Sequence, residues 1–551
     1  MSEKQTQTDF DVIQIGYGPV SKVSALLLDR LGWRVGVFER FGEFYPLPRA
    51  VCIDHEIFRD LHAAGLGQVA DKATDPAPAY RWMNAEWQEL LTIDWTQGSV
   101  SGGTEVNFVH QPTFELSLHA EALRRPRISL NFEHEYLGLT QHADHVEVRV
   151  RDTATGRESR HTARYVIGID GANSRVREQL GIGRTDLGFE ADWLVVDFAL
   201  KEGLTWRDLG IVECGQWCNP KRPTTIVPGG TGDGRVYRRW EFMRLPHESR
   251  EDMARPEKVR ELLGDWIKPE QGDLVRHAVY TFRSLVADEW RCGRVLLAGD
   301  AAHLMPPFMG QGMCAGLRDV WNLGWKLDRV LAGRADEALL DSYQPERRPH
   351  VIKIMEASMF LGSIICIPDE GKAAERDAMF LSGDPPAMAP FPILTDGFLA
   401  RDASGAVMAP AGELGPHGTA RLRRRTDRFD RLIPPNFTLL LDGGLNGGID
   451  ADALSPAGRA VLEGLGAQIV EVRGKTEARD DQIADTQGQI LPFMRARGVA
   501  ALVVRPDFYL FGGAKDATGL EAVLADLGRQ AQAFGLLDSR FAATSRQAEP
   551  A

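Results

Sequence analysis

The 551-residue sequence is poor in cysteine: it has six, and no two of them form a Cys-x-x-Cys motif. Cys214 and Cys218 are separated by three residues and have no second pair nearby, whereas a structural zinc site needs four ligands. We therefore expect no metal site, and we expect the reduced thiols of a cytosolic protein.

Long apolar runs and an excess of positive charge are absent as well. No run approaches the length of a membrane-spanning helix, and the polar start MSEKQTQTDF resembles neither a signal peptide nor a transit peptide. The formal net charge is −13, which disfavours nucleic acid or an anionic membrane as a partner. These absences predict a cytoplasmic protein that binds neither.

What is present begins with a β–α–β unit around a glycine-rich turn. Residues 10–15 are typical of a buried strand, and the turn Gly-Tyr-Gly-Pro-Val-Ser follows at 16–21, ahead of a predicted helix. A second strand at 34–38 ends in Glu39, about twenty residues beyond the glycines. This arrangement is the dinucleotide-binding fingerprint.

Each fingerprint residue has a physical task. Gly16 permits the tight turn, and Gly18 lets the backbone approach a pyrophosphate at the helix N-terminus. Glu39 is placed to accept hydrogen bonds from the ribose hydroxyls. Ser21 replaces the third glycine, which governs helix–strand packing; a serine fits with a small shift, and its hydroxyl offers a phosphate contact.

A second glycine-rich stretch predicts the floor of a ligand site. The short apolar run at 294–298 is typical of a buried strand, and it ends in Gly299-Asp300, where open α/β sheets bind ligands. Pro306-Pro307 keeps the chain extended. The turn at 310–312 leaves backbone N–H groups accessible before a helix that begins near Met313.

Two other glycine-containing turns have different interpretations. Asp170 ends a predicted strand before Gly171, so a second carboxylate lies at the carboxyl end of a strand. The segment from Gly230 to Gly234 imitates a phosphate loop, but it lies between two strands with no helix after it. We interpret it as a hairpin connection.

The predicted fold is α/β with two or three domains. A Rossmann-like domain is interleaved with an antiparallel-sheet domain, and a connecting segment leads to a C-terminal domain of thioredoxin type. That last domain contains no cysteine, so we expect packing or oligomer contacts, in a homodimer, rather than dithiol chemistry. The expected bounds are 1–75, 111–190 and 285–360 for the first domain, 76–110 and 191–284 for the second, 361–435 for the connection and 436–551 for the last.

Three separated motifs together resemble one family. The turn at 16–21 with Glu39, YVIGIDGANSRVR at 165–177 and GDAAHLMPPFMGQGM at 299–313 are similar to motifs of the FAD-dependent aromatic hydroxylases, the single-component flavoprotein monooxygenases. WCNPKRPTT at 217–225 and RRWEFM at 238–243 resemble the 3-(3-hydroxyphenyl)propionate hydroxylases. Phenol and polyketide hydroxylases share the architecture.

This resemblance implies non-covalent FAD, NADH or NADPH as co-substrate, and O₂. It implies a role in holding the ADP half of FAD for Gly16, Gly18, Pro19, Ser21, Glu39 and Arg40. Contacts to the phosphate, ribityl and isoalloxazine groups are implied for Arg49, Gln111, Asp170, Asp300, Pro307, Gly310, Gln311, Gly312 and Met313. His303 belongs to the same motif, but we interpret it as a packing residue.

The implied reaction is hydroxylation of a phenol ortho to its hydroxyl through a flavin C4a-hydroperoxide. A 3-(3-hydroxyphenyl)propionate-like acid is the expected substrate, and Arg222, Arg238 and Arg239 are candidates for a carboxylate clamp, although strand arginines are often solvated instead. No residue stands out as the base that removes the phenol proton, so the catalytic residues remain unassigned.

Alternative functions remain open at this point. Another phenol or a polyketide aromatic could be the substrate, and a non-oxygenating flavin oxidoreductase or a dinucleotide-binding protein without activity would share the fingerprint. A flavin-dependent halogenase would need a WxWxIP signature, which the sequence lacks.

Overall fold

The computed structural model describes residues 7–43, 47–383, 385–443 and 448–537. Its chain divides into two units. The division falls inside two long helices, α8 (Gly312–Leu331) and α9 (Tyr343–Ile365). Unit 1 comprises Met1–Gln97, Thr104–Arg318 and Val351–Phe391, and unit 2 comprises Gly98–Gly103, Asp319–His350 and Pro392–Ala551.

The first sheet of unit 1 contains the predicted β–α–β unit. Its order is β17-β18-β11-β1-β2-β8, and the pairs from β18 to β8 are parallel. Helix α1 (Pro19–Arg30) joins β1 to β2, and β9 and β10 extend β11 as an antiparallel meander. The strands are β1 (Phe10–Ile15), β2 (Val35–Phe38), β8 (Ile128–Asn131), β9 (His134–Gln141), β10 (Val146–Asp152), β11 (Glu158–Gly168), β17 (Arg291–Cys292) and β18 (Val295–Leu297).

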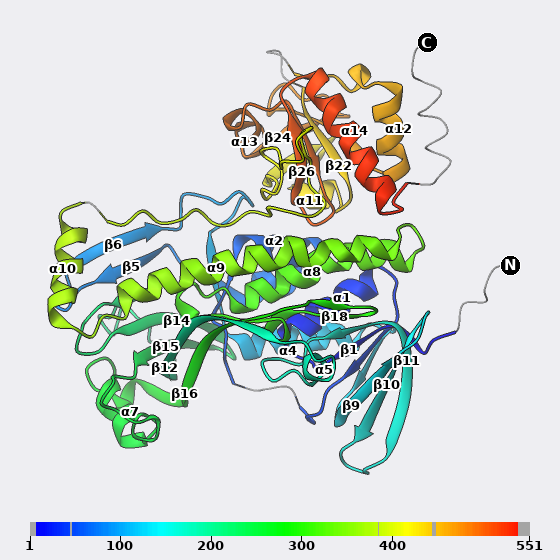
Figure 1. Cartoon of the computed structure of the whole chain (residues 1–551). Coiled ribbons are helices and arrows are strands. Elements are labelled where there is room, and N and C mark those ends of the chain that lie inside the picture. The colour runs from blue at the N-terminus through cyan, green and yellow to red at the C-terminus, as the bar shows by residue number, and fades with distance from the viewer. Residues whose placement is uncertain (1–6, 44–46, 384, 444–447, 538–551) are drawn as a thin grey trace. The chain divides into compact units, whose positions relative to one another are not determined.

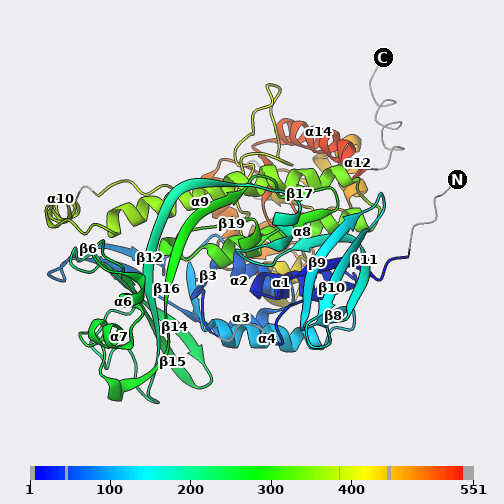
Figure 2. The same cartoon turned by 60° about the horizontal axis from the view of Figure 1, so that its bottom comes forward.

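The second sheet of unit 1 is the predicted antiparallel sheet, apart from the parallel pair β5–β13. Its order is β19-β16-β12-β15-β14-β13-β5-β6, and β12 and β16 run side by side as long curved strands (Figure 2). Gly230 to Gly234 connects β14 to β15, which confirms the hairpin. The strands are β5 (Ala79–Met83), β6 (Glu89–Asp94), β12 (Arg184–Leu200), β13 (Gly215–Trp217), β14 (Thr224–Gly232), β15 (Arg235–Met243), β16 (Gly272–Ala287) and β19 (His303–Leu304).

The two faces of this second sheet have different neighbours because strand residues alternate between faces. Leu194, Trp240 and Phe242 pack against α6 (Arg250–Met253) and α7 (Pro256–Leu263). The opposite face, which we name the inner face, carries Trp193, Val227 and Glu241. Phe308 of η3 (Pro307–Met309) contacts Trp193, and Cys52 packs against Val227.

The remaining elements of unit 1 surround these sheets. A small sheet has the order β3-β7-β4, and α10 lies beside the β5–β6 hairpin (Figure 1). Their bounds are β3 (Cys52–Asp54), β4 (Thr74–Pro76), β7 (Val106–Val109), α2 (His55–Ala63), α3 (Gly67–Ala73), α4 (Gln111–Leu123), α5 (Arg175–Gln179), α10 (Glu370–Leu381), η1 (Pro269–Gln271) and η2 (Gly299–Ala301).

Unit 2 has its own sheet and core. The order is β21-β20-β24-β23-β22-β25-β26, with α12 and α14 on one side and α13 on the other (Figure 1). Strands and helices alternate from β22 through α12 to β23, and α14 is the last helix described. The likeness to thioredoxin stays a prediction. The elements are β20 (Thr419–Leu422), β21 (Arg425–Arg428), β22 (Thr438–Asp442), β23 (Gln468–Gly474), β24 (Ile483–Asp485), β25 (Ala501–Val504), β26 (Leu510–Ala514), α11 (Phe429–Leu432), α12 (Pro456–Leu465), α13 (Ile490–Ala496), α14 (Ala517–Ala533), η4 (Glu337–Ser342) and η5 (Ala451–Ala453).

The segment expected as a connection, 361–435, is more structured than its composition indicated. It contains the end of α9, all of α10, and the strands β20 and β21, which belong to the sheet of unit 2. Its prolines and glycines cluster at 383–416, between these elements, and this explains the misleading composition.

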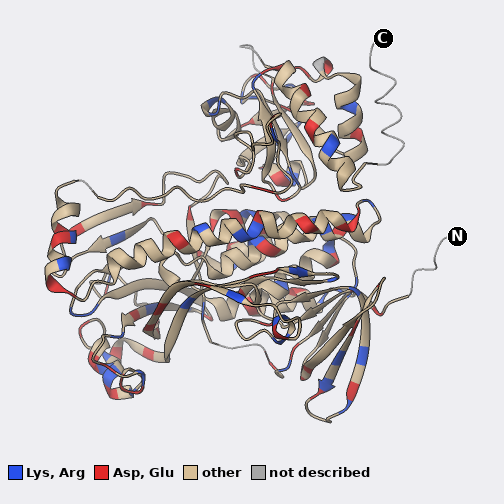
Figure 3. Ribbon diagram, in the orientation of Figure 1, with Lys and Arg blue, Asp and Glu red and all other residues tan. Residues whose placement is uncertain are grey.

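Charges of both signs are interspersed on the elements of each unit (Figure 3). In the described part of the chain, no single helix is long and apolar enough to cross a membrane. One bent pair, Glu337–Ile365 with Glu370–Leu381, meets the criteria by length and composition only.

Candidate cofactor and substrate site

The parallel sheet brings four separated segments of the chain to one edge. Parallel strands share the direction of their carboxyl ends, so the residues that follow β1, β2, β11 and β18 become neighbours. Backbone hydrogen bonds join them in a row: Gly16 N to Phe38 O at 2.9 Å, Ile169 N to Ile15 O at 3.0 Å and Ala298 N to Gly168 O at 3.1 Å. This carboxyl edge carries the predicted residues Gly16, Glu39, Asp170 and Asp300.

The two fingerprint glycines differ in their surroundings. Gly16 has φ +102°, and a Cβ there would lie 2.5 Å from the carbonyl oxygen of Ile169, so only glycine fits the turn. Gly18 is the N-cap of α1 with an ordinary φ of −76°, and a Cβ there would meet nothing within 4 Å. The space beside Gly18 is therefore open to a ligand at the helix N-terminus.

A second helix begins next to α1. A Cβ at Gly316, in the second turn of α8, would lie 2.8 Å from the Val20 side chain and 3.0 Å from Cα of Gly299. The first turn of α1 and the second turn of α8 thus pack together beside Gly299. The positive ends of two helix dipoles converge on this part of the carboxyl edge, which favours an anionic or electron-rich ligand.

The carboxyls of Asp300 and Asp170 occupy unusual positions. Asp300 is open to solvent, yet burial by surrounding protein raises its pKa, an effect that His303 and Arg49 oppose. A carboxyl with both properties projects into a recess. The Oδ1 atom of Asp170 is buried without a hydrogen-bond partner among the described residues, and burial raises its pKa too.

These features fit FAD. The open space at Gly18 suits a pyrophosphate, Glu39 lies where a ribose would, and the recessed Asp300 and the unmatched Oδ1 of Asp170 offer acceptors for hydroxyl groups. Gly310 (φ +65°) shapes the turn before α8, because a Cβ there would lie 2.6 Å from Sγ of Cys52. Gly312 and Met313 then start α8, and Pro307 starts η3.

A buried hydrogen-bond chain, which the motifs did not indicate, links the predicted residues. Gln111 accepts from the backbone N–H groups of Arg49 and Ala50 and donates to Glu115 at 2.6 Å. Lys22 donates to Glu115 at 2.6 Å and to Tyr17 O at 2.7 Å, and Tyr17 N donates to Glu39 at 2.9 Å. Lys22 and Glu115 were missed; a lone charge in the apolar helix SKVSALLL was the available signal.

Several predicted cofactor residues contact protein instead of open space. The buried Ser21 hydroxyl donates to Gln14 at 2.9 Å, so it is not free to contact a phosphate; the position serves helix–strand packing, as the glycine it replaces would. Arg40 is exposed over the Phe41 ring. Gln311 accepts from Arg318 at 2.9 Å, and Arg318 also pairs with Asp54, the N-cap of α2. His303 is buried beside Trp290.

The three arginines predicted as a carboxylate clamp all hydrogen-bond to acceptors of the protein itself, and the clamp stays a prediction. Arg222 holds Glu248 with both terminal nitrogens, at 2.7 and 2.5 Å. Arg238 is buried and donates to Glu213 O and Val212 O. Arg239 is buried, grips Asp197 at 2.7 and 3.1 Å, and donates to Pro48 O and Arg49 O. They support strands and loops, and none is a solvated strand arginine.

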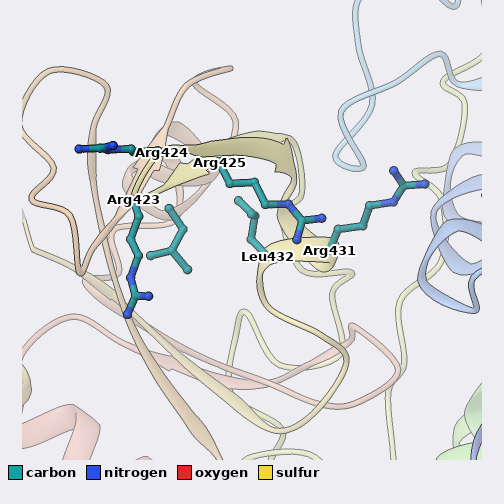
Figure 4. Close-up of a pocket in the computed structure, with 6 residues that line it drawn as sticks. Arg423, Arg424, Arg425, Arg431 and Leu432 are labelled. Atoms are coloured by element: carbon teal, nitrogen blue, oxygen red, sulfur yellow. The ribbon is translucent and has the colours of Figure 1, made fainter.

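A different set of arginines lines an open hollow in unit 2. Arg423, Arg424, Arg425 and Arg431 surround it with Leu422 and Leu432, on the β20–β21 hairpin and α11 (Figure 4). None of the predicted site residues lines this hollow. Among the residues that the structure describes, no group of His, Cys, Asp or Glu could hold a metal ion.

Comparisons with known proteins agree with this geometry. Residues 9–358 match the FAD binding domain family, and residues 412–530 match the HcaD C-terminal domain family. The chain is 35% identical over 530 residues to a probable NADH-specific resorcinol 4-hydroxylase of Rhodococcus jostii (strain RHA1), covering 94% of each chain. It is 34% identical to a 3-(3-hydroxy-phenyl)propionate/3-hydroxycinnamic acid hydroxylase of Mycolicibacterium gilvum (strain PYR-GCK), covering 91% of this chain and 88% of that one. The crystal structure of aklavinone-11 hydroxylase with FAD and aklavinone matches at TM-score 0.75 and 25% identity, over 95% and 100% of the chains.

Proposed function

This chain belongs to the family of FAD-dependent aromatic hydroxylases, and we propose that it hydroxylates a small meta-substituted phenol ortho to a hydroxyl group, with NADH as reductant. The leading substrate is resorcinol. We choose resorcinol over an acidic phenol because of the hydrogen bonds of three arginines, Arg222, Arg238 and Arg239. All three are bound to protein acceptors, so they are not available to anchor a carboxylate. The relative named for resorcinol and NADH supports it.

The chain's own residues have three tasks in this reaction. The carboxyl edge binds FAD, which supplies reduction by the nicotinamide and activation of O₂. Asp300 would hold the ribityl chain of FAD, and the turn at Gly310 would hold its ring end at the start of α8, where the helix dipole favours negative charge. The apolar inner face, with Trp193 against Phe308 at a 5.7 Å ring distance, excludes water from the reacting atoms.

A direct substrate comparison tests this proposal. Purified FAD enzyme would be given resorcinol, 3-ethylphenol, 3-(3-hydroxyphenyl)propionate and its methyl ester, while NADH oxidation and O₂ uptake are recorded and products are identified by mass. We expect resorcinol to give the highest kcat/KM, with one added oxygen and NADH preferred over NADPH. Absence of an oxygenated product with every phenol would refute the proposal.

The acid remains a second candidate, because several relatives carry its name. Charge-assisted anchoring of its carboxylate would raise kcat/KM over the methyl ester by roughly one to two decades. Such a preference would identify the acid as the substrate and would require a cation other than the three arginines.

A further inference from the structure

The inner face of the second sheet carries a row of polar side chains among apolar ones. Gln216 of β13 lies opposite Thr225 of β14, and Thr225 lies opposite Glu241 of β15. Directly opposite residues of antiparallel strands share a face, so the three side chains stand in line. Tyr80, on β5, extends the row, because its hydroxyl contacts Gln216 at 3.3 Å.

Glu241 is a buried carboxylate with few interactions inside the protein. No hydrogen bond to it occurs among the described residues, and its side chain is slightly open to solvent. Its nearest cation, Arg239, lies 3.8 Å away and is already gripped by Asp197. Burial raises the pKa of Glu241; Arg239 opposes this effect, Asp197 adds to it and Arg276 opposes it.

Glu241 also lies near the turn predicted to hold the flavin ring. Cys52 and Tyr80 pack in one hydrophobic cluster with Val227, which lies on the inner face two residues along β14 from Thr225. The Sγ of Cys52 lies 3.6 Å from the carbonyl oxygen of Gly310, so the row that contains Glu241 is close to this turn. A phenol between the inner face and the Gly310 turn would meet the Glu241 carboxylate.

The other members of the row are arranged to hold a hydroxyl group. The amide oxygen of Gln216 contacts the hydroxyls of Thr225 at 2.6 Å and Tyr80 at 3.3 Å. Its Nε2 has no partner in the part of the chain that the structure describes, and the residue is fully buried. Thr225 and Tyr80 are both partly open to solvent. Each hydroxyl can donate one hydrogen bond and accept others. Both can therefore bind a substrate oxygen in either orientation of the Gln216 amide, with its oxygen or its nitrogen toward them.

The spacing suits a ring with two meta hydroxyls. The strands of Gln216 and Glu241 are two inter-strand steps apart, or about 10 Å. A resorcinol with a hydrogen bond at each end spans about the same length. One hydroxyl can meet Glu241 while the other meets the Tyr80 hydroxyl beside Gln216. Thr225, one strand from Glu241, hydrogen-bonds to Gln216 and holds its amide in place.

We propose that Glu241 is the proton acceptor for the substrate phenol and that Tyr80, positioned by Gln216 and Thr225, binds its second hydroxyl. The phenol O–H bond breaks, the proton forms an O–H bond on the Glu241 carboxylate, and the phenolate keeps the electron pair, which activates its ortho carbon. This assignment rests on the proposed function, since it assumes a phenolic substrate.

The test is the pH profile of resorcinol hydroxylation by the full-length FAD enzyme. The wild type should lose activity as pH falls, because protonated Glu241 cannot accept the proton. Glu241→Gln should lose about 100-fold in kcat at pH 7, and its activity should rise with pH until the phenol ionises by itself, since a positioned base contributes about 10²–10⁴-fold. A wild-type pH profile in Glu241→Gln would overturn the assignment.

Two further variants separate catalysis from structural support. Asp197→Asn removes the main partner of Arg239 but keeps Glu241. It should lower the melting temperature and retain the loss of activity at low pH, which we name the acid limb. If Asp197→Asn instead reproduces the pH profile of Glu241→Gln, the proposal is overturned. Glu241→Asp keeps a carboxylate and should retain the acid limb at a shifted midpoint, and loss of the limb there would contradict the assignment even where the Gln variant fails to fold.

The row itself is tested through binding. Tyr80→Phe and Thr225→Val should each raise KM for resorcinol about tenfold and leave the acid limb in place. An unchanged KM in both variants would exclude the second-hydroxyl site. A wild type that oxidises no phenol would instead refute the proposed function, before any variant is compared.

Discussion

The carboxyl edge of the parallel sheet and the inner face of the antiparallel sheet use polar residues in opposite ways. At the edge, Gly18, Asp170 and Asp300 leave space or acceptor atoms open to a ligand. At the inner face, Arg239 and Asp197 satisfy each other, and the row of Gln216, Thr225 and Glu241 keeps polar atoms that the described residues leave without a partner. At a strand end, polar groups are available to a ligand because the chain turns there. On a sheet face, the availability of a polar side chain depends on which residue of the neighbouring strand lies opposite it.

The largest expected effect concerns Arg239 on the inner face. Arg239→Met leaves Asp197 buried without its bidentate partner, so we expect a loss of about 3–5 kcal/mol in the free energy of unfolding, measured by urea denaturation. The control is Arg283→Met on β16, whose exposed pair with Glu190 should be worth less than about 1 kcal/mol. If Arg239→Met is as stable as the wild type and loses only its preference for acidic substrates, Arg239 binds the substrate carboxylate.

Two glycine variants test the different roles of Gly16 and Gly18 at the carboxyl edge. Gly16→Ala forces a side chain to φ +102° and against Ile169 O, and should cost about 2–3 kcal/mol of stability. Gly18→Ala meets no protein atom, so the apoprotein should lose no more than about 0.5–1 kcal/mol, yet its affinity for FAD should fall at least tenfold. Titration of the apoproteins with FAD checks both. Full FAD affinity in Gly18→Ala would exclude a close approach of the pyrophosphate.

Glu39 provides a smaller test of the same edge. Glu39→Ala removes the ribose acceptor and should weaken FAD binding by about 1.5–3 kcal/mol, or roughly one to two decades. Glu158→Ala, exposed on β11, is the control and should retain wild-type affinity. If Glu39→Ala retains FAD as tightly, the carboxylate serves only the backbone of Tyr17 and Phe41.

The smallest expected effect concerns Arg222 and pH. Burial would raise the pKa of Glu248, but hydrogen bonds from Arg222 and Leu245 N–H outweigh it and lower the pKa to about 2. The folded state therefore binds a proton less readily than the unfolded chain, so the pair stabilises fully above about pH 5. About 1–2 kcal/mol should be lost as pH falls from there to about 2. Glu248→Gln should remove that part of the acid dependence; an unchanged dependence would show that the pair contributes nothing.

Much of the fold was predictable because its signals are local. The β–α–β unit, the Gly230–Gly234 hairpin and the Asp54 N-cap each depend on residues within a few positions of one another. The segment 361–435 was harder, because β20 joins a sheet through β24, about sixty residues later, and among the described strands β21 pairs only with β20.

The sequence by itself determined the cofactor class and the carboxyl edge of this protein, since parallel strands place their carboxyl ends side by side whenever the fold forms. Only the tertiary structure decided the roles of Ser21, Lys22 and the three arginines. Their partners, Gln14, Glu115, Glu248 and Asp197 among them, are chosen by packing and strand register, and a buried charge binds whichever opposite group the fold brings within reach.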